Sequence, residues 1–121
     1  PDKGRQEGFD LKLSLSDINM KNWKEIKKLS PFGFGNPKPV FLFEGVKIEK
    51  IKKFGKNGSG EHLELTFSDQ NKETVAVSFF SGVDSFRNTL SEGLGVNLLA
   101  TFDLSRFRGR EELRLRIEDI I

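Results

Sequence analysis

The 121-residue chain has no cysteine, a single histidine and no long apolar run. The absence of cysteine excludes a disulfide framework and thiolate chemistry, which fits a cytoplasmic origin. No run of residues reaches the length of a membrane-spanning helix, so no membrane role is indicated. Residues 1–8 contain neither an initiator Met nor the apolar segment of a secretory signal. We therefore expect the chain to be a piece of a longer protein.

The composition is that of one small soluble domain, with 31% charged and 36% hydrophobic residues. A net charge of +2 is too small to indicate nucleic-acid binding, so the placement of the charges matters more than their sum. Between Val46 and Gly58 there are five lysines and one acidic residue, and between Ser105 and Arg116 there are five arginines and two acidic residues. This uneven distribution predicts a domain with one basic side.

Residues 31–39 combine prolines and glycines with large aromatic side chains. Because proline fixes φ and glycine permits turns, neither a helix nor a sheet strand is expected there. Phe32 and Phe34 would leave apolar surface in water, so we interpret the segment as an ordered connector with both rings buried. A flexible linker is the alternative.

Alternating apolar and polar residues predict a half-buried strand over residues 9–15. A helix is predicted to begin after a cap at Ser16 or Asp17 and to run to Leu29. Trp23 is either a platform for base stacking or a core anchor, and its helical spacing with other apolar residues favours the core.

Five further strands follow, with apolar positions within residues 41–53, 63–67, 75–79, 96–102 and 113–117. The alternation in the first of them slips near Glu49 and Lys50, which predicts a β-bulge. A short helix is predicted over residues 81–91. In the second and third of these strands, the residues expected to face outward are His62, Glu64, Thr66, Ala76 and Ser78, and Phe80 is the only aromatic platform expected beside them.

This order is typical of the OB-fold, a mainly β, five-stranded Greek-key barrel with a helix between strands three and four. An SH3-like barrel is the nearest alternative, and the predicted helix argues against it. The domain division that we predict is a strand-helix remnant of a preceding domain at 1–30, a connector at 31–39 and the OB-fold domain at 40–121.

In an OB-fold the loop after strand one and the loop between strands four and five flank the ligand channel, so the two basic clusters should meet there. Basic residues would follow phosphates and an occasional aromatic ring would stack on a base. A merely soluble basic face is the alternative reading. The candidate nucleic-acid-binding residues are Lys50, Lys52, Lys53, Phe54, Lys56, Arg106, Phe107, Arg108 and Arg110.

Two other features carry no predicted chemistry. His62 has no nucleophile or third group near it in sequence, so we interpret it as a solvated strand or loop histidine. The glycine-rich run at 55–60 lacks the Gly-Lys-Ser/Thr ending of a phosphate-binding loop and leads into a strand, so we interpret it as a hairpin turn.

Four segments resemble the RecJ family of single-strand-specific exonucleases, most specifically the run LSPFGFGNPKPVF at residues 29–41. The run GEHLEL at 60–65 is similar to a motif before the family's second barrel strand, and residues 107–120 are similar to its closing hairpin. Residues 9–19 resemble the closing strand and helix entry that follow the family's catalytic core. The similarity therefore covers most of the chain, from about Phe9 to Ile121.

The resemblance implies a parent enzyme of DNA repair and recombination that degrades single-stranded DNA from its 5′ end with Mn²⁺ or Mg²⁺. This domain would help to hold the strand, and its partners would be single-stranded DNA, the catalytic core of the parent chain and a single-strand-binding protein. The family's Asp-His-His motif lies upstream of this region. One histidine cannot supply the converging carboxylates and imidazoles of a two-metal site, so this chain should hold no metal cofactor and should not cut DNA. An OB module that docks a protein is the other function that we consider.

Overall fold

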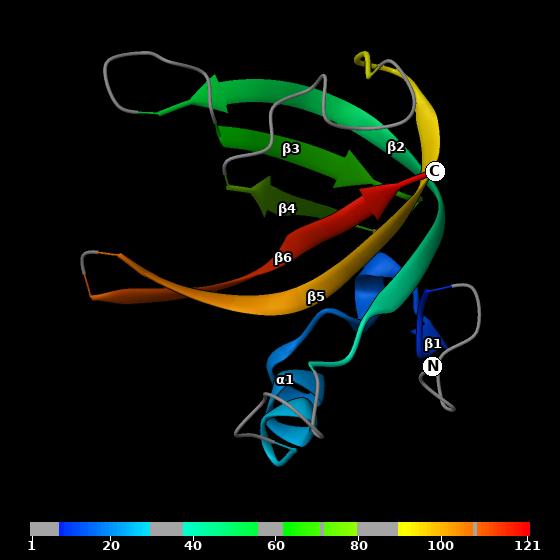
Figure 1. Ribbon diagram of the computed structural model, residues 1–121. Helices are drawn as coiled ribbons and strands as arrows, with labels where there is room; N and C mark the ends of the chain where they lie inside the picture. Colours follow the sequence, from blue (N-terminus) through cyan, green and yellow to red (C-terminus); the bar gives the residue numbers. More distant parts are fainter. Residues whose placement is uncertain (1–7, 30–37, 56–61, 71, 80–89, 108) are drawn as a thin grey trace.

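The chain folds into a closed β-barrel with a short helical segment at one end (Figure 1). The structure is a computed structural model that describes residues 8–29, 38–55, 62–70, 72–79, 90–107 and 109–121. The elements are β1 (Leu11–Lys12), the 3-10 turn η1 (Leu15–Asp17), α1 (Met20–Lys27), β2 (Phe41–Phe54), β3 (His62–Ser68), β4 (Glu73–Ser78), β5 (Gly95–Phe107) and β6 (Arg110–Ile120).

The strands pair in the order β1-β2-β3-β4-β6-β5, and an additional pairing of β2 with β5 closes β2 to β6 into a barrel. The five-stranded OB-fold predicted from the sequence is confirmed. The helix predicted at 81–91 lies outside the described residues, except for residues 90 and 91. Phe32 and Phe34 of the connector, whose rings were predicted to be buried, also lie outside them.

β2 bends enough to pair with two strands because its ladder is interrupted twice. Its pairing with β3 shifts register between Ile48 and Lys50, which confirms the predicted β-bulge. Its pairing with β5 shifts between Phe43 and Val46. Gly45 lies inside that second interruption at φ 64°, a backbone conformation that favours glycine. The two interruptions allow β2 to curve around the barrel.

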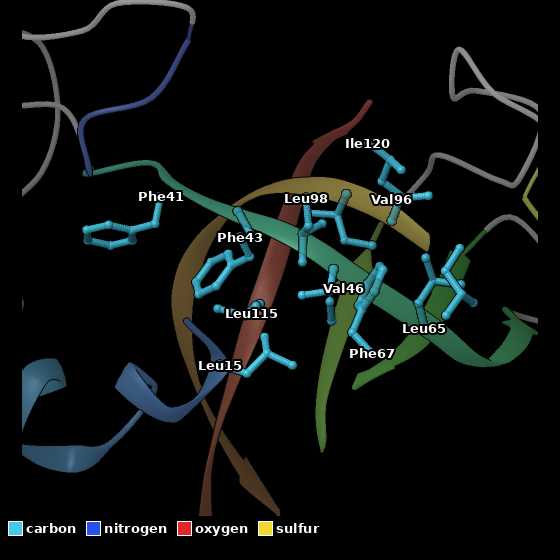
Figure 2. Close-up of a cluster of buried hydrophobic side chains, with 14 of the residues drawn as sticks. Leu15, Phe41, Phe43, Val46, Leu65, Phe67, Val96, Leu98, Leu115 and Ile120 are labelled. Atoms are coloured by element: carbon cyan, nitrogen blue, oxygen red, sulfur yellow. The ribbon is translucent and has the colours of Figure 1, made fainter. Parts of the chain in front are cut away.

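The barrel core contains three fully buried phenylalanines, Phe43, Phe67 and Phe102, together with many aliphatic side chains. Figure 2 shows Phe43 and Phe67 among the aliphatic side chains of this cluster. Leu15 and Ile18, from the segment before α1, belong to the same buried cluster. The N-terminal segment therefore contributes to the core of the barrel.

Polar contacts tie this segment to the turn between β3 and β4. The backbone N–H of Leu15 donates to Asp69 Oδ2 at 3.2 Å, and Lys72 Nζ donates to the carbonyl oxygen of Ile18. Asp69 Oδ1 also accepts from the backbone N–H of Lys72 at 3.0 Å, which holds the turn in shape. Leu15 and Ile18 are thus fixed over the barrel end by hydrogen bonds as well as by burial.

The predicted start of the helix at Ser16 or Asp17 is wrong. α1 begins after Asn19, whose side-chain oxygen accepts from the backbone N–H of Asn22 at 2.9 Å. Asp17 instead accepts from the backbone N–H of Ser14 at 2.9 Å and stabilises η1. Trp23 is partly buried and packs against the core cluster, which favours the core-anchor interpretation.

The predicted strand over residues 9–15 is much shorter in the structure. Only Leu11 and Lys12 pair with β2, in parallel, and both are exposed. Beyond them the chain turns to bury Leu15 in the barrel, so it cannot continue along the edge of β2.

The outward assignment of Ala76 and Ser78 is also wrong, and Phe80 lies outside the described residues. Residues paired directly across an antiparallel ladder share a face, and Leu65 pairs with Ala76 while Leu63 pairs with Ser78. Ala76 is fully buried in the core cluster. Small side chains on β4 leave room for the large ones of β3 inside the barrel, so the other β4 positions face outward.

A candidate nucleic-acid interface on the outer sheet face

One continuous face on the outside of the barrel crosses β2, β3, β4 and β6. We call it the outer sheet face. The register places Lys52 opposite Glu64, Glu64 opposite Val77, and Val77 opposite Arg116. Three interstrand spacings separate the ends of this row, roughly 14 Å. The residues of the outer sheet face are Lys50, Lys52, Phe54, His62, Glu64, Thr66, Val75, Val77, Phe79, Arg114 and Arg116, of which Val77 is fully buried.

Three rings on this face form an aromatic cluster: Phe54 at the end of β2, His62 at the start of β3 and Phe79 directly after β4. The ring centroids of Phe54 and His62, which pair across β2 and β3, lie 5.1 Å apart. Phe79 lies 5.4 Å from His62 and 6.1 Å from Phe54, both at edge-to-face angles. All three side chains are partly exposed, so ring surface remains accessible at this place.

Two arginines of β6 extend the cluster. The guanidinium carbon of Arg116 lies 4.8 Å from the centroid of the Phe79 ring, and that of Arg114 lies 6.0 Å away. Asp103 on β5 accepts from Arg114 Nε at 2.8 Å and lies 3.9 Å from a terminal nitrogen of Arg116. Aromatic surface and positive charge are therefore adjacent on the outer sheet face.

The candidate lysines proposed from the sequence do not all lie on the same face of β2. Lys50 and Lys52 are exposed on the outer sheet face, where they pair with Thr66 and Glu64. Lys53 pairs with Leu63 and therefore lies on the opposite face of β2. Phe54 joins the aromatic cluster, and Lys56 lies outside the described residues.

The proposed arginines lie at the tip of the β5–β6 hairpin, which Figure 1 shows projecting from the barrel on the same side as the end of β2. Arg106 is exposed, and its Nε donates to Glu111 at 2.8 Å. Arg110 is exposed and pairs through its backbone with Phe107. The side chain of Phe107 lies outside the described part of the structure. Arg108 also lies outside the described residues.

The arginines that share a sheet face and register with Lys50 and Lys52 are therefore Arg114 and Arg116, which belong to the predicted basic cluster but were not among its candidates. A groove of about 440 Å³ connects the part of the hairpin next to its tip with β3 and β4. Its lining residues are Glu64, Val75, Ser105, Arg106, Glu112 and Arg114.

Sequence reasoning missed Phe79 because it assigned the wrong face of β4 to the core, whereas it predicted the outward position of His62 on β3 but gave that residue no role in binding. Val75, Val77 and Phe79 alternate like core residues, and nothing in their own pattern marks them as outward. The available signal was the small pair Ala76 and Ser78, which fits opposite the leucines of β3.

The described residues offer no cluster of three or more His, Cys, Asp or Glu side chains that could hold a metal ion. The Mn²⁺ or Mg²⁺ implied for the parent enzyme is therefore not assigned to any described residue. None of the described helices is long and apolar enough to cross a membrane.

Comparison with known proteins identifies the relatives of this chain. The single-stranded-DNA-specific exonuclease RecJ of Bacillus subtilis (strain 168) is 27% identical over 110 residues, which cover 91% of this chain and 14% of that protein. RecJ from Thermus thermophilus shares the fold in its complexes with Mg²⁺ (TM-score 0.66, 20% identity) and with Mn²⁺ (TM-score 0.68, 21% identity). The matches cover 99% and 100% of this chain and 17% and 16% of the two RecJ chains.

The chain thus spans about a seventh of the length of its Bacillus relative. The RecJ OB domain family matches residues 9–119, which include the aromatic cluster and all of the described strands except the last residue of β6. The chain therefore belongs to the RecJ OB domain family.

Proposed function

We propose that this chain is the strand-binding OB domain of a RecJ-like 5′-to-3′ exonuclease and that it positions single-stranded DNA for a catalytic core elsewhere in the parent protein. The observation that carries the proposal is the aromatic cluster flanked by Arg114 and Arg116 on the outer sheet face. The name of the Bacillus relative, a single-stranded-DNA-specific exonuclease, supports the choice of ligand.

The chemistry of this face suits a single strand of any sequence. Unpaired bases expose π-faces that can stack on the partly exposed rings of Phe54, His62 and Phe79. Lys52 on β2 and Arg116 on β6 lie at the two ends of one row, with β3 and β4 between them. A DNA backbone that crosses the outer sheet face therefore meets a positive charge at each end of this row. No hydrogen bond to a base edge is needed, which makes the binding tolerant of sequence.

We expect Lys52→Gln to weaken binding of a fluorescein-labelled oligothymidylate and to flatten its salt dependence. Each lost phosphate contact should lower the slope of log affinity against log salt by roughly 0.7. The measurement is fluorescence anisotropy over a series of salt concentrations.

Lys53→Gln is the matched control, because it removes the same charge from the neighbouring residue on the opposite face of β2. It should leave the slope close to that of the unchanged chain. Equal effects of the two substitutions would mean that the lysines act through general charge, and the outer sheet face would lose its support as the interface.

A protein-docking function is the second candidate, and one surface favours it. A groove of about 470 Å³ between α1 and the start of β2 is lined mainly by apolar residues, among them Leu11 and Leu29, which are 56% and 52% exposed. The catalytic core of the parent protein or a single-strand-binding protein could cover it. Partner binding that survives neutralisation of both Lys50 and Lys52 would favour this function over strand binding.

We expect no degradation of single-stranded DNA by this chain with either Mn²⁺ or Mg²⁺, because the described residues lack a metal-ligand cluster. The assay is release of fragments from an end-labelled oligonucleotide, with addition of chelator as the control. Chelator-sensitive cleavage that co-purifies with the chain in independent preparations would contradict this expectation.

A further inference from the structure

An acidic side chain lies where a DNA-binding face should avoid one. Asp103 on β5 contacts both arginines that flank the aromatic cluster, and its side chain is only 18% exposed. By charge alone, this carboxylate should repel a phosphate backbone and weaken binding.

Asp103 contacts the two arginines at different distances. Arg114 pairs with Asp103 directly across the β5–β6 ladder, donates its Nε at 2.8 Å and is 22% exposed. Arg116 lies diagonally, pairs with Thr101, approaches Asp103 only to 3.9 Å and is 47% exposed. The carboxylate therefore holds Arg114 tightly and Arg116 loosely.

Both guanidinium groups also lie near the single ring of Phe79, at 6.0 Å for Arg114 and 4.8 Å for Arg116. Two positive charges at one ring repel each other, and the negative charge of Asp103 offsets that repulsion. Without Asp103, one arginine would be expected to leave its place beside Phe79.

We infer that Asp103 is a positioning residue for single-strand binding, which keeps Arg116 at the ring of Phe79 with its terminal nitrogens available to a phosphate of the DNA backbone. Arg114 is the fixed member of the pair, and Arg116 is the one that contacts the phosphate. This inference rests on the proposed function of the outer sheet face and assigns a role to a residue outside the basic clusters.

The test exploits the sign of the effect. Asp103→Asn makes the chain more positive, so simple attraction predicts tighter binding, whereas the positioning role predicts affinity lower by about threefold or more. The probe is the same labelled oligothymidylate, measured by anisotropy over a salt series, with thermal unfolding of each variant as a check on folding. Glu112→Gln is the matched control, since it removes one negative charge two residues from Arg114 on β6 and should not weaken binding.

A double-mutant cycle with Arg116→Gln separates positioning from general stability. If Asp103 acts through Arg116, Asp103→Asn should cause little further loss once Arg116 is gone. Arg116→Gln alone should lower the salt slope by roughly 0.7, as expected for one phosphate contact. Because Arg116 is more exposed than Asp103, this variant remains informative even where Asp103→Asn unfolds the chain.

The outcomes are distinguishable from a failure of the proposed function. Weaker binding by Arg116→Gln together with unchanged or tighter binding by Asp103→Asn would overturn only the role of Asp103. Unchanged affinity and salt slope in Arg116→Gln would overturn that role and would also remove Arg116 from the proposed interface. Equal losses from Asp103→Asn in the presence and absence of Arg116 would overturn the inference as well.

Discussion

Leu15→Ala is expected to lower the free energy of unfolding by about 3 kcal/mol, within the range measured for leucine truncation in protein cores. Leu15 is fully buried in the same cluster as Phe43 and Leu115, although it precedes every strand of the barrel (Figure 2). Truncation to alanine would leave a cavity at the barrel end that η1 closes. Urea denaturation of the two chains measures the difference.

Leu11→Ala is the matched control for this prediction. It is the same substitution four residues earlier in the same segment, at a side chain that is 56% exposed. Its effect should stay within about 0.5 kcal/mol. Similar small effects at both positions would indicate a segment separable from the barrel, as the predicted division into 1–30 and 40–121 supposes.

Phe79→Ala is expected to weaken oligonucleotide binding by about 1–3 kcal/mol at every salt concentration, the usual value of a base stacked on an aromatic ring. Phe79 contacts the other two rings of the aromatic cluster and lies beside Arg116. Because the ring carries no charge, the loss should be similar in low and high salt, in contrast to Lys52→Gln. Anisotropy titrations give both quantities in one experiment.

Two further substitutions at Phe79 test whether the ring itself matters. Phe79→Tyr keeps a ring at the edge of the cluster and should retain most of the affinity, while Phe79→Leu keeps apolar volume without a π-face and should behave like Phe79→Ala. Full affinity in Phe79→Leu would show that the side chain only supports the sheet, and base stacking at this place would be abandoned.

The barrel could be predicted from sequence because its strands obey short-range rules. Alternation located the five strands, and the slip at Glu49 and Lys50 located a bulge that the register confirms. The start of α1 failed because Asp17 and Asn19 are both good caps, and only the burial of Leu15 decides between them. That burial depends on β3 and β4, far away in sequence.

The candidate site was only partly predictable for a related reason. Lys50, Lys52 and Phe54 follow one another on one strand, so their common face follows from the period of two. Arg116 joins them only through the parallel pairing of β4 with β6, a long-range contact that no local pattern reveals. The face of β4 was ambiguous because apolar residues occupy both of its sides.

The path of β2 has a consequence for how the barrel forms. Its C-terminal half pairs with β3, the next strand in sequence, whereas its N-terminal half joins Phe41 to Ala100 on β5. The pairing of β2 with β3 closes a short loop of chain. The pairing of β2 with β5 closes a loop that contains most of the barrel, so it costs more conformational entropy. We expect the β2–β3–β4 meander to form first and closure through β5 to limit the rate, with folding on the millisecond-to-second scale of β-barrels. Until that closure the edge of β2 offers unpaired backbone groups to other chains, which makes this strand the place where misassembly would begin.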